Sequence, residues 1–130
     1  MNTFLKKYDV LIIGAGIVGL ALARALGRRG KSILVLDRND FASGASIRNF
    51  GMVWPIGQPQ GDLFERSMLS KSIWQEVCNE AKIWYDPVGS LHLAYNRKEM
   101  DVLNAFFEQV KDERDYKILS ADEARKYSTS

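Results

Sequence analysis

Two short apolar runs near the start of the chain flank a stretch with helical spacing. The first run covers residues 8–13, and the second covers residues 32–37. Between them, apolar positions recur with helical periodicity over residues 17–29, which predicts a helix with one apolar face. The second run has no polar alternation, so we expect a strand buried on both faces, as in a parallel sheet covered by helices. The pattern predicts a strand–helix–strand unit.

The later part of the chain shows a second group of elements. They are, in order, a helix over residues 62–81, a turn at 86–89, a half-buried strand over 90–95, a helix over 97–111, a short strand near 117–119 and a helix from residue 121. Asn96 with Glu99, and Ser120 with Glu123, have the spacing of capping boxes. These pairs predict the starts of the last two helices.

Residues 39–61, between the two groups, are rich in Gly, Pro, Ser and Asn. A loop of this length inside a compact domain is uncommon, and such loops are usually functional or disordered. Embedded Phe41, Phe50 and Trp54 favour packing over disorder. We therefore expect a functional loop.

The turn after the first strand carries the pattern Gly14-x-Gly16-x-x-Gly19. In the dinucleotide-binding fingerprint, the first glycine permits a sharp turn, the second lets the backbone approach a pyrophosphate, and the third lets the helix pack on its strand. The positive end of the helix then faces the pyrophosphate. Asp37 ends the second strand at the expected distance and would accept hydrogen bonds from ribose hydroxyls. Strand, glycines, helix, strand and acid in this order predict a dinucleotide site.

Composition narrows the class of protein. The 130 residues are 46% hydrophobic and 26% charged, which is typical of a globular domain, and a net charge of +2 indicates no nucleic-acid partner. No apolar stretch reaches the ~18 residues that a transmembrane helix needs. The single cysteine, Cys78, excludes an internal disulfide and favours the cytoplasm. We find no nucleophile motif and no His/Cys set with metal-ligand spacing.

Residues 44–53 (Gly-Ala-Ser-Ile-Arg-Asn-Phe-Gly-Met-Val) resemble a segment of the flavin-dependent amino-acid and amine oxidases. This superfamily includes glycine oxidase, sarcosine oxidase and D-amino-acid oxidase, whose members carry Gly-Ala-Ser followed by Gly-Met at similar spacing. The resemblance implies FAD as the cofactor and a segment that passes along the ribityl phosphate and the isoalloxazine ring. Residues 88–94 and 119–124 are similar to the start of the family's substrate domain.

The resemblance implies an α/β fold, with a partial Rossmann-like FAD-binding domain at residues 1–85 and the beginning of an α+β substrate domain at 86–130. Family members are longer, and later strands complete their flavin domain, so the chain resembles an N-terminal fragment. The expected cofactor-binding residues are Gly14, Gly16, Ile17, Val18, Gly19, Asp37, Arg38, Gly44, Ala45, Ser46, Arg48, Asn49, Gly51 and Met52. Ser43 and Ser46 would lend hydroxyls to the phosphates, and Trp54 is a candidate to line the site.

The implied reaction is the oxidation of a C–N bond of a small amine or amino acid by hydride transfer to the flavin. Such chemistry needs no acid–base pair from this part of the chain, and we assign no catalytic residue. Residues 48–59 further resemble a branch proposed to act on aminophosphonates. Two alternatives stay open: an NAD(P)-dependent dehydrogenase, which uses the same fingerprint, and a catalytically incomplete dinucleotide-binding fragment. Arg38 could equally be an exposed side chain, and Arg48 could merely brace the loop.

Overall fold

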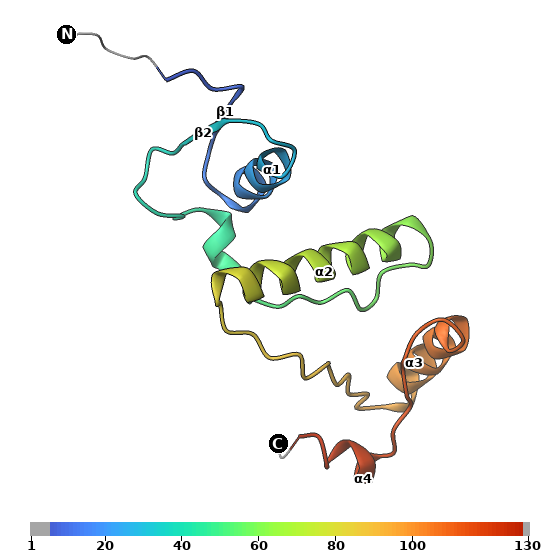
Figure 1. Ribbon diagram of the computed structural model, residues 1–130. Helices are drawn as coiled ribbons and strands as arrows, with labels where there is room; N and C mark the ends of the chain where they lie inside the picture. Colours follow the sequence, from blue (N-terminus) through green and yellow to red (C-terminus); the bar gives the residue numbers. More distant parts are fainter. Residues whose placement is uncertain (1–5, 129–130) are drawn as a thin grey trace, which may run out of the picture. The chain divides into compact units, whose positions relative to one another are not determined.

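The computed structural model describes residues 6–128, and Figure 1 shows its elements in chain order. They are β1 (Val10–Ile13), α1 (Ile17–Gly27), β2 (Ile33–Leu36), the 3-10 helix η1 (Ala45–Arg48), α2 (Asp62–Ala81), α3 (Arg97–Val110) and α4 (Ala121–Ala124). Two compact units make up the chain, and the boundary between them lies between Met52 and Val53. The predicted domain boundary at residue 85 is a different division and stays a prediction.

The first unit contains the strand–helix–strand arrangement that the sequence predicts. β1 and β2 pair in parallel, with Val10 opposite Ile33 and Ile13 opposite Leu36. The N–H of Gly14 extends the pairing by donating to the carbonyl oxygen of Leu36 at 2.7 Å. Because parallel strands need a crossover connection, α1 lies between them in sequence and packs on the pair.

Both strands are shorter than the predicted runs. Just before their first residues, side-chain hydrogen bonds connect the two segments. The Asp9 N–H donates to Ser32 Oγ at 3.0 Å, and the Ser32 N–H donates to Asp9 Oδ2 at 2.8 Å. The Ser32 hydroxyl donates to the same carboxylate oxygen at 2.8 Å. Asp9 and Ser32 therefore join the amino ends of the two strands.

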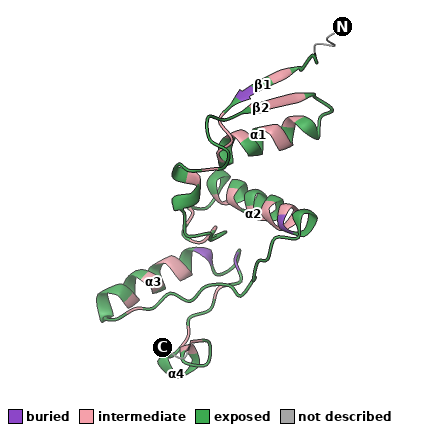
Figure 2. Cartoon of the chain, turned by 90° about the vertical axis from the view of Figure 1, so that its left-hand side faces the viewer, coloured by how far each residue is buried: buried purple, intermediate pink, exposed green. Residues whose placement is uncertain are grey.

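The prediction that the second strand is buried on both faces is wrong for the described residues. Ile12 is buried, whereas its neighbour Ile13 is 84% exposed, and Leu36, the partner of Ile13, is 47% exposed. Side chains alternate between the two faces of a strand, so α1 covers only the face that carries Ile12. Figure 2 shows the resulting pattern, in which exposed and half-buried positions dominate both strands.

In the second unit, α2 has the predicted bounds and α3 begins at the predicted residue. Asn96 Oδ1 accepts the N–H of Glu99 at 3.0 Å, while the Glu99 carboxylate accepts from Asn96 Nδ2 and from the N–H of Tyr95. The sequence signal for this cap is therefore confirmed, although the return bond reaches Tyr95 instead of the Asn96 backbone.

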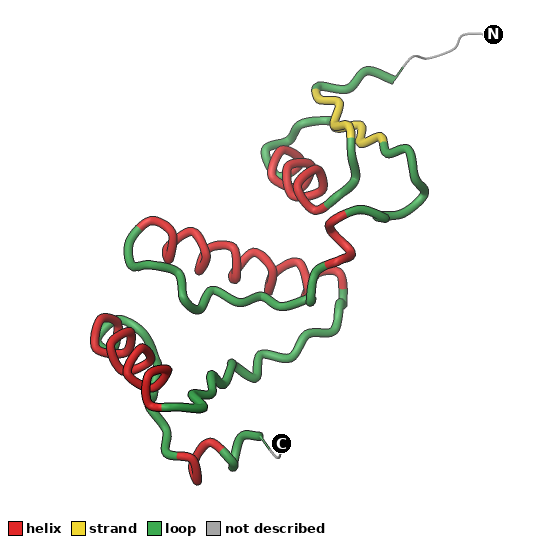
Figure 3. The backbone as a smooth tube through the Cα atoms, turned by 180° about the vertical axis from the view of Figure 1, so that it is seen from behind, coloured by secondary structure: helices red, strands yellow, loops and turns green. Residues whose placement is uncertain are grey.

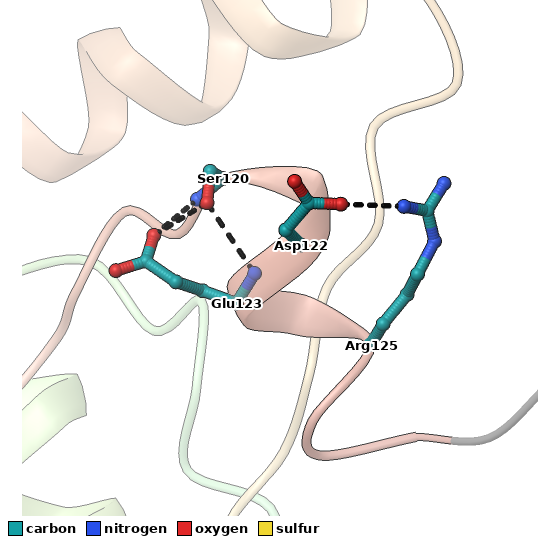
Figure 4. Close-up of polar contacts among 4 residues, drawn as sticks. All are labelled: Ser120, Asp122, Glu123 and Arg125. Atoms are coloured by element: carbon teal, nitrogen blue, oxygen red, sulfur yellow. Dashed lines mark hydrogen bonds and ion pairs between the residues drawn. The ribbon is translucent and has the colours of Figure 1, made fainter.

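The start of α4 is a complete capping box (Figure 4). Ser120 Oγ accepts the N–H of Glu123 at 3.3 Å, and Glu123 Oε2 accepts from the N–H and the hydroxyl of Ser120. An ion pair from Arg125 to Asp122, 2.6 Å long, spans the same turn. The predicted cap is confirmed.

The two strands predicted in the second unit do not form. Residues 90–95 and 117–119 run as loops without strand pairing (Figure 3). A strand is defined by hydrogen bonds to a neighbouring strand, and none of residues 6–128 supplies one beyond the β1–β2 pair. Alternating apolar and polar positions predict which face of a strand would be buried, but they do not show whether a neighbouring strand is present to pair with it.

Burial in the second unit is sparse. Cys78, Val110 and Arg114 are its buried residues within the described part of the chain. None of the helices in residues 6–128 combines the length and the apolar character needed to cross a membrane.

Candidate cofactor-binding site

A cleft of about 380 Å³ opens in the first unit at the carboxyl ends of β1 and β2. Three segments line it: residues 13, 14 and 16 at the end of β1 and in the turn that follows, residues 37–39 after β2, and residues 42–46 up to the start of η1. In open α/β sheets, ligands bind outside the carboxyl ends of the strands. The volume lies at the small end of the range for ligand pockets.

The fingerprint glycines each meet a steric demand in this unit. Gly14 has φ +106°, a conformation that side chains with a Cβ rarely adopt. A Cβ on Gly19 would lie 2.0 Å from the Gly14 carbonyl oxygen and 3.3 Å from Ile12 Cγ2. Gly19 therefore lets α1 lie against the turn that leaves β1, as the sequence predicts.

Asp37 bridges the two segments that follow the strands. Its Oδ2 accepts the N–H of Ala15 at 2.7 Å, and its Oδ1 accepts the N–H of Asn39 at 2.9 Å. The bond from Ala15, followed by that from Asn39, lowers the pKa of the Asp37 carboxyl below its ordinary value of 3.8. The carboxylate is therefore anionic at neutral pH, and each oxygen keeps a lone pair for a further donor.

Ser46 brings the loop onto the start of α1. Its Oγ accepts the N–H of Ile17 at 2.9 Å, although the two residues are far apart in sequence. A Cβ on residue 16 would lie 3.1 Å from that oxygen, so glycine at this position leaves room for the hydroxyl. η1, which the sequence did not predict, is the element that carries Ser46.

The amino end of α1 suits an anionic ligand. Gly16 provides no side-chain cap, and the first turn contains no acidic residue. A helix start leaves N–H groups without intrahelical partners and carries partial positive charge. The N–H of Ile17 already donates to Ser46 Oγ, so a pyrophosphate in the cleft would meet the other N–H groups of the first turn. It would not face a carboxylate from the helix, so the residues present fit a dinucleotide.

The structure gathers many of the predicted cofactor-binding residues at the cleft and leaves others outside it. Those that line it are Gly14, Gly16, Asp37, Arg38, Gly44, Ala45 and Ser46. Ile17 is outside the lining, and its N–H donates to the lining residue Ser46, whereas the side chain of Val18 is 79% exposed on α1. The other predicted residues outside the lining are Gly19, Arg48, Asn49, Gly51 and Met52. Their contact with the cofactor stays a prediction, as does that of the lining residues.

Sequence reasoning did not assign Ile13, Asn39 and Ala42 to the site, although all three line the cleft. Asn39 has the clearest role, because its N–H donates to Asp37 and its Nδ2 donates to Ser43 Oγ at 2.9 Å. The available signal was an asparagine two residues after the strand-end acid, since such short polar side chains organise turns.

His92, Trp54 and Cys78 do not line the cleft. His92 stacks on Trp54, with ring centroids 5.5 Å apart and planes 11° from parallel, so this histidine has an aromatic neighbour. Cys78 is buried on α2. Within residues 6–128, no three His, Cys, Asp or Glu side chains are grouped to hold a metal ion.

Comparison with known protein families identifies the class to which this βαβ unit belongs. Residues 9–129 match the family of FAD-dependent oxidoreductases that includes the D-amino-acid oxidases. The chain belongs to this family. Its cofactor is FAD and its characterised members are enzymes, so the family supports the resemblance found in residues 44–53 and speaks against a nicotinamide-dependent dehydrogenase.

Curated proteins that are similar to the chain in sequence have names that give different substrates. L-2-hydroxyglutarate dehydrogenase of Arabidopsis thaliana is 32% identical over 102 residues, which cover 76% of this chain and 21% of the relative. Glycerol 3-phosphate dehydrogenase of Caloramator mitchellensis is 31% identical over 108 residues, covering 78% and 22%. D-amino acid dehydrogenase of Helicobacter pylori is 40% identical over 47 residues, covering 36% and 12%.

The chain spans about a fifth of the length of the first two relatives. No solved structure matches the chain significantly. The match over residues 9–129 establishes the family and its cofactor. The names of the relatives differ in the substrate that they give.

Proposed function

We propose that this chain supplies the FAD-binding amino-terminal part of an oxidoreductase that oxidises a C–N bond of a small amine or amino acid. In this role residues 14–19 bind the pyrophosphate, Asp37 binds the adenosine ribose, and residues 44–52 run along the flavin. FAD, when bound, accepts the hydride from the substrate. The residues of this chain bind and orient that cofactor.

One observation carries the proposal: Asp37 and the amino end of α1 line the same cleft, with Asp37 anionic and the helix start free of acidic side chains. Ribose hydroxyls are donors and pyrophosphate is an acceptor, so the two ends of the site complement two different parts of one dinucleotide. A site for a simple anion would not place the Asp37 carboxylate in the same cleft, because the two negative charges repel each other.

Oxidation of C–N in preference to C–O rests on the likeness of residues 44–53 to the amine and amino-acid oxidases. The relative named D-amino acid dehydrogenase supports it, whereas the relative named L-2-hydroxyglutarate dehydrogenase favours a hydroxy acid. The aminophosphonate branch is a narrower form of the same proposal and rests on residues 48–59. Residues 86–130 would then begin the substrate domain. A cytoplasmic location rests on the single cysteine.

Calorimetric titration of the chain with FAD, ADP and NAD tests the cofactor site directly. We expect binding of FAD and ADP, with FAD bound more tightly because it adds flavin contacts. Asp37→Ala should weaken both by about tenfold or more, since it removes charged acceptors from the ribose hydroxyls. Asp40→Ala is the matched control, because it removes one carboxylate from an exposed position in the same loop.

Absence of FAD binding, or equal loss of binding in the Asp37 and Asp40 variants, would contradict the proposed site. The substrate class needs a second experiment, because this chain by itself is expected to be inactive: an FAD-loaded protein that contains this chain together with a complete substrate domain is mixed anaerobically with amino acids, an aminophosphonate and 2-hydroxy acids. Bleaching of the flavin absorbance by amines alone supports C–N oxidation. Bleaching by hydroxy acids alone overturns that part of the proposal and leaves the cofactor site intact.

A further inference from the structure

Asn39 follows Asp37 by two positions and lines the cleft of the first unit. Its backbone N–H donates to Asp37 Oδ1 at 2.9 Å, and its side-chain Nδ2 donates to Ser43 Oγ at 2.9 Å. Ser43 lines the same cleft. Asn39 therefore contacts both the acid expected at the ribose and a hydroxyl expected at the phosphates.

The bond from the Asn39 amide determines what Ser43 can offer to a ligand. A serine hydroxyl has one hydrogen to donate and two lone pairs that accept. Because Ser43 Oγ accepts from Asn39, its own hydrogen is directed elsewhere, and none of residues 6–128 accepts it. Accepting a hydrogen bond also makes the hydroxyl a stronger donor, since successive bonds polarise one another. Ser43 is thus prepared to donate to a ligand in the cleft.

A donor with a fixed direction has a clear use in this cleft. The Asp37 carboxylate, which lines it, is anionic at neutral pH and repels a phosphate. A hydroxyl that donates to a phosphate oxygen offsets part of that repulsion. Without the Asn39 amide, the Ser43 hydroxyl could rotate and donate in other directions. Fixing its direction before the ligand arrives reduces the entropy that is lost on binding.

Ser46 shows the same arrangement elsewhere in the cleft lining. Its Oγ accepts the N–H of Ile17 at 2.9 Å, and its hydrogen has no acceptor in the part of the chain that the structure describes. Both serines therefore accept from the protein and keep their hydrogens for a ligand. The donor to Ser46 is backbone, whereas the donor to Ser43 is a side chain. The orientation of Ser43 can therefore be changed by a single substitution at residue 39.

We propose that Asn39 is a positioning residue for the cofactor, whose amide orients the Ser43 hydroxyl as a donor to a phosphate oxygen of the FAD pyrophosphate. This inference rests on the proposed function, because it takes the cleft to hold the ADP part of FAD. It assigns Asn39 no contact with the cofactor. Side-chain substitutions of Asn39 keep the backbone N–H that donates to Asp37, so the ribose end of the site is preserved.

The test is a double-mutant cycle on ADP affinity, measured by titration calorimetry on the full chain. Ser43→Ala removes the donor, so we expect ADP affinity to fall about tenfold. Asn39→Ala leaves the hydroxyl free to rotate and should lower the affinity by about threefold to tenfold. The double variant should lie within twofold of Ser43→Ala, because the amide acts only through the hydroxyl. Asn104→Ala is the matched control, since it removes an exposed amide from α3 and should leave ADP affinity unchanged.

Asn39→Asp separates positioning from a purely structural role in the turn. Aspartate forms such turns as well as asparagine does, so a structural role predicts the affinity of wild type. A carboxylate instead accepts the hydrogen of Ser43 and adds a negative charge to the cleft. The same substitution in the Ser43→Ala background measures the effect of that charge by itself. We therefore expect Asn39→Asp to lower ADP affinity by a larger factor when the Ser43 hydroxyl is present.

Circular dichroism establishes that each variant is folded, and Asn39→Asp in the two backgrounds decides the question if Asn39→Ala is not. Wild-type affinity for ADP in either Asn39 variant overturns the positioning role. Equal losses with and without the Ser43 hydroxyl overturn it as well, because the side chain at residue 39 then acts independently of Ser43. In these cases the loss expected for Asp37→Ala remains, so the proposed function stands. Failure of wild type to bind ADP and FAD overturns the proposed function and this inference with it.

Discussion

The carboxylate of Asp37, at the end of β2, accepts the backbone N–H of Ala15 at 2.7 Å in the turn that follows β1. This bond joins the two strand ends that form the cleft, and the same side chain also accepts the N–H of Asn39. The acid that the fingerprint assigns to the ribose thus has a second task in the free protein. It ties the glycine turn after β1 to the end of β2.

The pH dependence of stability should report this second task. Because the folded pKa of Asp37 is lowered, the stabilisation is present above its ordinary value of 3.8 and is lost as the pH falls through the lowered value. Asp37→Asn should lower the melting temperature at neutral pH and flatten its decline in acid. Melting curves from neutral pH to below 3.8 check this, with Asp40→Asn as the control. Parallel curves for wild type and Asp37→Asn would contradict the role.

Two glycines of α1 offer a matched pair of substitutions. Gly19→Ala places a Cβ 2.0 Å from the Gly14 carbonyl oxygen, and because backbone must move, we expect a loss of about 1–3 kcal/mol in unfolding free energy. In Gly27→Ala the nearest atom is Ile33 Cδ1 at 3.8 Å, an ordinary contact. Alanine there should be neutral or stabilise by up to about 1 kcal/mol through helix propensity. Urea unfolding measures both, and equal effects would show that α1 does not pack closely on the turn.

Local signals predicted the elements that depend on neighbours in sequence. The bounds of α2 follow from its long apolar stripe, and the starts of α3 and α4 follow from Asn96 and Ser120. The glycine turn and the strand-end acid likewise placed the centre of the site, because their spacing is a property of one βαβ unit. Each of these features depends on residues that are close in the sequence, so the sequence pattern is sufficient to predict it.

Contacts between distant residues were out of reach of the same reasoning. The bond from Ile17 to Ser46 depends on a 3-10 helix whose Ala-Ser-Ile-Arg sequence has no helical periodicity to detect. The strand expected over residues 90–95 does not form for the opposite reason: its pattern is present, but no segment of residues 6–128 pairs with it. The burial of Arg114 was not predicted, because nothing local in the sequence indicates its contacts with Gln58, Gln60 and Phe64.

The cap of α3 allows the same substitution to be made with opposite expected signs. Asn96→Ala removes the acceptor for the Glu99 N–H, which should cost about 0.5–2 kcal/mol. Asn104→Ala, at an exposed position inside α3, should stabilise the helix by a few tenths of a kcal/mol or more, because alanine has the higher helix propensity. Helicity by circular dichroism and urea unfolding distinguish the two. A gain in helicity in both variants would mean that Asn96 does not act as the cap.

The pairing of Asp9 with Ser32 at the amino ends of the strands should behave as a coupled unit. The N–H of Ser32, followed by its hydroxyl, lowers the pKa of the Asp9 carboxyl, so the stabilising bonds weaken as the pH falls below 3.8. Asp9→Ala removes the two bonds to its carboxylate, and Ser32→Ala removes the two bonds that involve its hydroxyl, so the substitutions share the bond from Ser32 Oγ to Asp9 Oδ2. In a double-mutant cycle at neutral pH, the combined loss of unfolding free energy should therefore be smaller than the sum of the single losses.

The size of that coupling should fall in acid, because protonation of Asp9 removes the charge that strengthens its bonds to Ser32. Ser72→Ala paired with Asp9→Ala is the control, since the Ser72 hydroxyl bonds to Leu69 in α2 and shares no partner with Asp9. Additive losses for Asp9 and Ser32 at neutral pH would mean that the bond between the two side chains does not contribute to stability. Coupling at neutral pH that disappears below 3.8 would instead identify the carboxylate as the group that joins β1 to β2 on the side away from the cleft.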